Sequence, residues 1–196
     1  MANTKSSSRP CVRDRILAAA SELFYKEGVQ NVGIDRIIAE SGVAKMSLYN
    51  HFKSKDALIA AWLQEQDHHW RCWFQAAVER LATTPEDRVL AIFDALQESF
   101  EEPDFRGCAF LNSAVELVNP DHPGYQVSLD HQQATFDYIL SLVRAAKFPN
   151  AEELTQQLVI LMIGATVVAM MGRNSKAAVQ ARQAAATLIA ASQSTA

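Results

Sequence analysis

The sequence predicts an all-α protein with about nine helices. Apolar residues recur at three- and four-residue spacing along most of the 196 residues, and no segment shows a convincing strand pattern. Gly and Pro fall between these periodic segments and divide them into separate helices. A hydrophobic content of 49% is ample for a buried core, and the length allows a small domain beside a larger one.

Capping residues set the boundaries of the individual helices. Starts are indicated by Ser54, by Thr84 before a proline, and by Asn150, while Gly28 and Gly42 are placed to end helices. We expect helices at residues 11–27, 34–41, 44–50, 54–81, 84–101, 108–118, 123–147, 150–172 and 175–192. The polar residues 1–10 are expected to form a disordered arm.

The most specific segment is 34–55, with the sequence IDRIIAESGVAKMSLYNHFKSK. It predicts two short helices joined at Gly42, with Val43 filling the turn and Leu48 anchoring the second helix. A helix this short and this polar gains little stability by itself, so its outward side chains are candidates for function. The segment at about 34–53 therefore predicts a helix-turn-helix that reads DNA.

The second short helix would place its first residues against base edges in the major groove. We expect Lys45, Met46 and Ser47 to lie there. The remaining residues expected to contact DNA, mostly at phosphates, are Tyr49, Asn50, His51, Lys53, Lys55 and Arg13.

The distribution of charge agrees with this placement. The net charge is −4, yet residues 1–60 carry nine Lys and Arg against six Asp and Glu, a charge of +3, and residues 61–196 carry −7. The positive field therefore lies at the N-terminal end. A value of only +3 favours a few placed contacts, made by two copies, over a broad basic patch.

Short motifs follow one another in a fixed order between residues 15 and 58. They are Ile16-Leu17, Leu23-Phe24, Gly28, Gly42-Val43, Leu48-Tyr49, His51-Phe52 and Ser54-Lys55. In these motifs the chain resembles the tetracycline-repressor family of bacterial regulators. Gly33 departs from the family pattern, in which Thr or Ser often stands at this helix cap and donates to a phosphate.

The resemblance implies a domain organisation and a function. It implies an N-terminal three-helix DNA-binding domain at residues 11–71 and a helical effector-binding and dimerisation domain at residues 72–196. It also implies a homodimeric repressor that binds double-stranded DNA at a palindromic operator and is released by a small-molecule effector. An activator of the same family and a helical dimeric protein-interaction module without DNA binding are the alternatives.

The last two predicted helices are the expected dimer surface. The run at 158–171, LVILMIGATVVAMM, is apolar nearly all round, and the final helix is rich in alanine, which lets helices approach closely. Burial inside one subunit is the alternative. The run is shorter than the roughly 20 residues of a membrane span, and the first residues lack a signal core, so we expect a cytoplasmic protein without a membrane partner.

The segment between these regions is the expected effector site. Aromatic residues are dense there, and a few polar residues occur on otherwise apolar helices, as is usual for small-molecule cavities. The candidates are Trp62, His69, Trp70, Trp73, Phe93, Phe110, Asn112, Glu116, His131 and Tyr138. For each of them, plain core packing or a satisfied helix contact is the alternative.

Other classes of function find little support in the sequence. No nucleophile elbow, P-loop or dinucleotide fingerprint is present, so we expect no catalytic site, no enzyme activity and no cofactor. His68 and Cys72 lie four residues apart, but no second ligand pair accompanies them, so no metal site is expected. Three widely spaced cysteines indicate a reducing compartment, and a redox role for Cys72 or Cys108 stays open.

Overall fold

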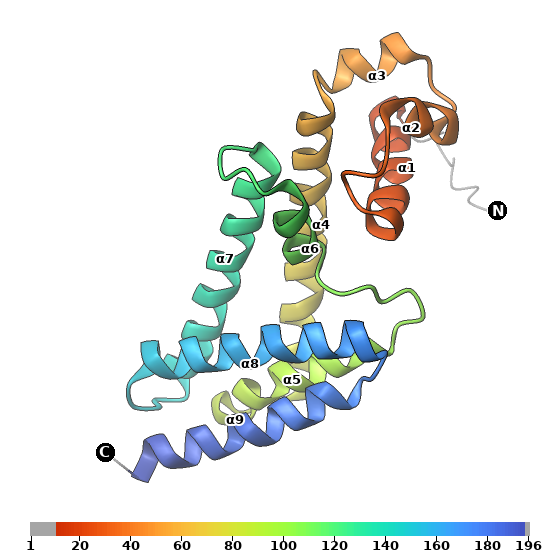
Figure 1. The fold of residues 1–196 in the computed structure, drawn as a ribbon. Helices are drawn as coiled ribbons and strands as arrows, with labels where there is room; N and C mark the ends of the chain where they lie inside the picture. The colour runs from red at the N-terminus through yellow and green to blue at the C-terminus, as the bar shows by residue number, and fades with distance from the viewer. Residues whose placement is uncertain (1–10, 195–196) are drawn as a thin grey trace, which may run out of the picture.

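The computed structural model describes residues 11–194, which form nine helices and no strand (Figure 1). The helices are α1 (Val12–Glu27), α2 (Ile34–Ser41), α3 (Lys45–His51), α4 (Lys55–Leu81), α5 (Pro85–Glu101), α6 (Ala109–Leu117), α7 (Pro123–Ala145), α8 (Ala151–Gly172) and α9 (Lys176–Ser194). The all-α prediction is confirmed, and each boundary lies within two residues of the expected one. The expected polar arm at residues 1–10 lies outside the described residues.

Two of the three predicted side-chain caps form. Ser54 Oγ accepts a hydrogen bond from Ala57 N–H at 3.1 Å, and Thr84 Oγ1 accepts one from Asp87 N–H at 3.1 Å. Asn150 stands at the cap position of α8, but its side chain makes no capping bond, so that prediction is wrong. Its backbone is left-handed, with φ 51° and ψ 47°, whereas a capping side chain needs extended backbone to reach the first turn.

The N-terminal core joins α1, α2 and α3 to the first half of α4. Its fully buried side chains include Ile16, Ile37, Leu48 and Leu63. Residues at helical spacing on each helix converge there, as their periodicity predicts. We call these helices, with α4 up to residue 71, the N-terminal unit.

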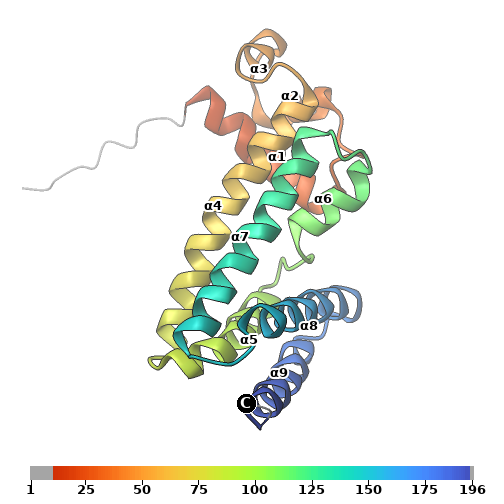
Figure 2. The same cartoon turned by 90° about the vertical axis from the view of Figure 1, so that its left-hand side faces the viewer.

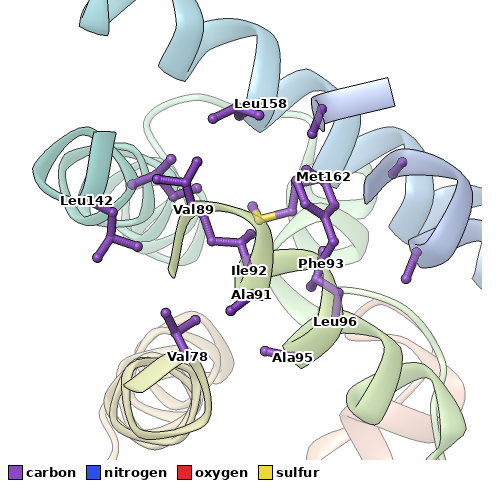
Figure 3. Close-up of a cluster of buried hydrophobic side chains, with 14 of the residues drawn as sticks. Val78, Val89, Ala91, Ile92, Phe93, Ala95, Leu96, Leu142, Leu158 and Met162 are labelled. Atoms are coloured by element: carbon purple, nitrogen blue, oxygen red, sulfur yellow. The ribbon is translucent and has the colours of Figure 1, made fainter. Parts of the chain in front are cut away.

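The C-terminal core lies among α4, α5, α7, α8 and α9. Figure 3 shows Ile92 and Phe93 of α5 facing Leu158 and Met162 of α8, with Leu142 of α7 beside them. In Figures 1 and 2, α4 and α7 lie side by side, while α8 and α9 pack together near the end of the molecule opposite α3. The molecule thus has a small helical unit at one end and a helical pair at the other.

Helix α8 is longer than the apolar run that suggested it. It has 22 residues and contains an 18-residue window with a mean hydropathy of 1.9, so it is long and apolar enough to cross a membrane by length and composition alone. The argument that the 14-residue apolar run is too short for a membrane span therefore does not hold for the whole helix. A core helix meets the same criterion, and α8 packs on α5, α7 and α9 through buried residues such as Leu158 and Ala165.

Gly42 provides a test of the turn between α2 and α3. Its backbone is left-handed at φ 62° and ψ 33°, and a Cβ there would lie 3.1 Å from the Arg15 guanidinium. We expect Gly42→Ala to lower the free energy of unfolding by about 1–2 kcal/mol in a urea titration, because a side chain strains this conformation. As a control, Gly33→Ser should cost nothing measurable, since φ is −84° there and no described atom lies within 4 Å of its Cβ position. Equal losses would contradict this account of the turn.

Candidate functional site

Arg15 of α1 holds the turn of the helix-turn-helix in place. Its guanidinium donates to the carbonyl of Ser41 at 2.7 Å and to that of Gly42 at 3.0 Å. These carbonyls are among the unpaired acceptors at the end of α2. Val43 and Leu48 are buried beneath the turn. The orientation of α3 is therefore fixed by contacts on its inner side, which leaves the outer side free.

The outer side of α3 carries the side chains that were predicted to face bases. Met46 is 74% exposed, Lys45 and Asn50 are exposed, and Ser47 is half-buried. Lys45 Nζ lies 3.0 Å from Asp35 Oδ1 of α2 in an exposed ion pair. An ion pair this exposed adds little to the stability of the fold, so an approaching phosphate or base edge can replace it.

The remaining predicted DNA contacts surround α3. Tyr49, His51 and Lys53 are exposed. The Arg13 guanidinium lies 5.5 Å from the ring centre of Phe52, a cation–π distance that keeps this cation beside α3. Lys55 differs from the others, because its Nζ donates to the Gln30 carbonyl at 3.3 Å and partial burial lowers its pKa. All nine residues lie on or beside α3, and their contact with DNA stays a prediction.

The described residues line a partly open cavity of about 430 Å³ between α4, α5, α6, α7 and α8. Trp70, Phe100, Phe105 and Phe110 supply aromatic walls, and Met162 of α8 contributes to the lining. A larger groove of about 1470 Å³ runs between α1, α6 and α8 and shares Tyr25, Phe100 and Phe105 with the cavity. The smaller cavity has the size and the mainly apolar walls of small-molecule sites.

One wall of the cavity is a buried histidine with a fixed ring. His131 Nδ1 lies 2.7 Å from Asp67 Oδ1, and Asp67 Oδ2 pairs with Arg71 at 2.9 Å. The Phe110 ring stacks on the imidazole with the ring centres 3.6 Å apart, and Trp70 meets it edge-on at 4.9 Å. The imidazole is therefore held on several sides.

The ten predicted ligand residues divide among three environments. Trp70, Phe110 and His131 line the 430 Å³ cavity. Trp62, Asn112 and Glu116 line the larger groove, while His69, Trp73, Phe93 and Tyr138 line neither hollow.

Local packing explains the seven that lie outside the cavity. Trp62 is buried in the N-terminal core, with its Nε1–H donating to Ser21 Oγ at 3.2 Å. Phe93 is buried in the C-terminal core, and Tyr138 packs edge-on against Phe74. His69 and Trp73 are exposed. The other two, Asn112 and Glu116, hold nearby backbone: the Asn112 amide donates to the Arg106 carbonyl at 3.1 Å.

Glu116 links α6 to the N-terminal unit. Its carboxylate accepts a hydrogen bond from Gln30 N–H at 3.0 Å. A Cβ at Gly28 would lie 2.8 Å from both carboxylate oxygens, so the glycine makes room for this contact. Because α6 also supplies Phe110 and Ala114 to the cavity wall, one short helix touches both the cavity and the N-terminal unit.

Sequence reasoning missed most of the cavity wall, including Thr135, and it missed Asp67, which contacts His131. Asp67 was missed because an acid on a long helix resembles a solvated surface residue. Thr135 lies one helical turn after His131 on α7, and its buried Oγ1 has no hydrogen-bond partner among the described residues. The i, i+4 spacing of His131 and Thr135 on a buried face of α7 was the available signal.

No group of three or more His, Cys, Asp or Glu that could hold a metal occurs within residues 11–194. Cys108 lies at the cavity wall, where burial raises the pKa of its thiol. A raised pKa keeps the sulfur protonated at neutral pH and so weakly nucleophilic.

A helix-turn-helix with an exposed second helix, joined by α4 to a helical body with a cavity, defines a DNA-binding transcriptional regulator rather than an enzyme. Residues 16–62 match the family described as "Bacterial regulatory proteins, tetR family". The structure superposes on a TetR-family transcriptional regulator from Streptomyces coelicolor with a TM-score of 0.84 and 31% identity, covering 91% of this chain and 94% of that one. The chain therefore belongs to the TetR family.

Curated relatives agree with this assignment. The transcriptional regulator YjdC of Escherichia coli is 20% identical over 78% of this chain and 80% of its own length. The transcriptional repressor DhaR of a Mycobacterium species is 30% identical over 56% of this chain and 54% of its own length, so the match spans about half of DhaR.

His131 makes the stability of the protein depend on pH. Burial lowers the pKa of His131, and the hydrogen bond with Asp67 opposes this only in part. The folded protein thus binds this proton less readily than the unfolded chain. The resulting stabilisation is fully present above the pKa of the unfolded chain, about 6.5 for an ordinary histidine. It is lost as the pH falls through the lowered pKa of His131 in the folded protein. We expect the free energy of unfolding to fall between pH about 7.5 and about 5.5, and to fall less in His131→Gln. Equal losses in urea titrations of the two proteins would contradict this.

Proposed function

We propose that the protein is a homodimeric repressor that binds a palindromic operator and is released when a small molecule occupies the 430 Å³ cavity. The observation that carries the proposal is the exposed face of α3, held by the Arg15 clamp at the end opposite the α8–α9 pair. We assign residues 11–71 to DNA binding and residues 72–196 to effector binding and dimerisation. The border lies inside α4, which continues from one unit into the other.

The DNA-binding face follows from the exposure of α3. Lys45, Met46 and Ser47 stand at its N-terminal end and would meet base edges in the major groove. Tyr49, Lys53 and the nearby Arg13 would contact phosphates on either side. Gly33 offers no hydroxyl at the start of α2, so any phosphate contact there uses a backbone N–H group.

Dimerisation is supported by an apolar stripe on α8. Ile160, Gly164, Val168 and Met171 follow one another at three- and four-residue spacing, and all four are exposed in the single chain. No described atom lies within 4 Å of a Cβ built at Gly164, so a partner helix can approach closely there. An exposed apolar stripe of this kind is typical of a subunit interface.

Effector release requires a connection between the cavity and α3. Two connections are present: α4 carries Trp70 at the cavity wall and runs directly to α3, and α6 carries Phe110 at the cavity and Glu116 at Gln30. A ligand that fits the cavity better in one arrangement of these helices shifts the population toward that arrangement. The distance between the two α3 helices of a dimer then changes, and the operator no longer matches.

Repression is supported by the relative DhaR, which is a repressor. Activation is the alternative, because the same face of α3 would contact DNA in both cases. A protein-interaction module without DNA binding is the other alternative, and the first experiment below separates it from both.

Substitutions on and beside α3 separate base-reading from phosphate-binding residues. After bound fragments are selected from the source genome, we expect Lys45→Ala and Ser47→Ala to change the preferred bases. We expect Lys53→Gln to weaken binding by a similar factor on all sequences. Each dimer would lose two phosphate contacts, so the slope of log affinity against log salt should fall by about 2.

Lys147→Gln is the control for this experiment, because Lys147 is exposed at the end of α7 and far from α3. It should leave both the affinity and the salt slope unchanged. If the unmodified protein gives no salt-sensitive, sequence-specific shift, the interaction module is the better assignment. If the Lys45 and Ser47 variants keep the original base preference, the reading face is misplaced.

A charge placed in the α8 stripe tests the proposed dimer interface. Val168→Asp places a charge in the α8 stripe, and we expect it to raise the dimer dissociation constant at least about tenfold, because the carboxylate would be buried without a partner. Light scattering after size exclusion measures the change. Val115→Asp is the matched control, since Val115 is 70% exposed but belongs to α6 and is not part of the α8 stripe. Dimers that persist equally in both variants would contradict the interface.

A further inference from the structure

We propose that the 430 Å³ cavity accepts an uncharged, largely apolar ring compound that carries a hydroxyl group, with His131 and Thr135 as its hydrogen-bonding partners. The inference rests on the proposed function, in which this cavity is the effector site, and it adds the chemical class of the effector. It is carried by the composition of the cavity wall and by two polar atoms. His131 Nε2 makes no hydrogen bond within residues 11–194, and the buried Thr135 Oγ1 has no partner among the described residues.

The wall excludes charged ligands. Among the described residues that line the cavity, none is Asp, Glu, Lys or Arg. Asp67, which contacts His131, does not line the cavity and is paired with Arg71 at 2.9 Å. A carboxylate or an ammonium entering the cavity would lose its hydration and find no countercharge, which we expect to weaken its binding at least about tenfold.

His131 offers an acceptor to the ligand. The Asp67 carboxylate can only accept, so the Nδ1 atom 2.7 Å away must carry the hydrogen. Burial holds the ring in its neutral form by lowering its pKa, and Nε2 then keeps its lone pair. Nε2 makes no hydrogen bond within residues 11–194, and the stacked Phe110 ring prevents the imidazole from turning to find one. The ligand must therefore donate at this point.

Thr135 offers a second partner one turn further along α7. Its side chain is buried, and its Oγ1 lacks a partner in the described part of the chain. Side chains at i and i+4 on a helix have Cβ atoms about 5–6 Å apart. A single hydroxyl placed between them can donate to His131 Nε2 and accept from Thr135 Oγ1. The aromatic walls from Trp70, Phe100 and Phe105 suit a ring on the rest of the ligand.

A matched series of naphthalene derivatives tests the proposal on the full chain by titration calorimetry. The probes are 2-naphthol, its methyl ether, naphthalene, 2-naphthoate and 2-naphthylmethylammonium. We expect 2-naphthol to bind about 3- to 10-fold more tightly than the ether, which cannot donate. We expect the anion and the cation to bind at least about tenfold more weakly than 2-naphthol. Equal binding of the ether or of either ion, or no saturable binding of 2-naphthol, would overturn the proposal.

A second measurement assigns the hydroxyl partner. Thr135→Val removes the hydroxyl at nearly constant volume, and we expect 2-naphthol to lose about threefold or more in affinity while naphthalene keeps its own. Thr155→Val is the matched control, because Thr155 is also buried, lies outside the cavity and donates to the Ala151 carbonyl at 2.7 Å. If both variants bind 2-naphthol like the unmodified protein, Thr135 is not a partner and the assignment fails.

Fluorescence anisotropy of operator DNA, followed in parallel, separates this inference from the function on which it rests. If the probes bind in the expected order without releasing DNA, the chemistry of the cavity is upheld and effector release is rejected. If DNA is bound and released but the two ions act as well as 2-naphthol, the function is upheld and the present inference is overturned.

Discussion

The fold depends on one continuous helix that belongs to two cores. The first half of α4 buries Leu58 and Leu63 in the N-terminal core, and the second half buries Phe74 and Val78 in the C-terminal core. With 27 residues, α4 is about 40 Å long. A straight helix of this length moves as a rod, so the position of α3 is tied to the tilt of α4 against α5 and α7.

The contact between Glu116 and Gln30 is a further connection between α6 and the N-terminal unit, and it also affects the position of α3. It adds to the packing of Phe110 and Leu117 of α6 in the N-terminal core and to the hydrogen bond that Tyr25 donates to the Gly107 carbonyl. Through the Glu116 contact, α6 holds Gln30 in the loop after α1. Lys55, at the start of α4, holds the same residue by donating to its carbonyl. A shift of α6 that follows ligand binding must therefore move this loop or break its hydrogen bond. Either result changes the support of α3.

Local features were predictable from the sequence, and tertiary ones were not. The helix-turn-helix could be predicted because Gly42, Leu48 and the polar residues around them act within a few residues of one another. Trp62 and Trp70 show the limit. Both lie on α4, eight residues apart, yet Trp62 is enclosed by the N-terminal core and Trp70 lines the cavity, because different helices cover the two positions. The role of Asp67 depends on α7, which is distant in sequence, so no local pattern could indicate it.

The arrangement also limits how large an effector-driven movement needs to be. In the proposed dimer, α8 holds the subunits together at one end while α3 lies at the other (Figure 2). A tilt of α4 by about 5° over its length of about 40 Å displaces α3 by about 3 Å in each subunit. Recognition helices must sit one turn of DNA apart, about 34 Å, and a combined change of several ångströms spoils that match. A neutral ligand hydroxyl that binds between His131 and Thr135 in only one tilt would therefore be sufficient, since the cavity gains its missing hydrogen bonds in that arrangement alone.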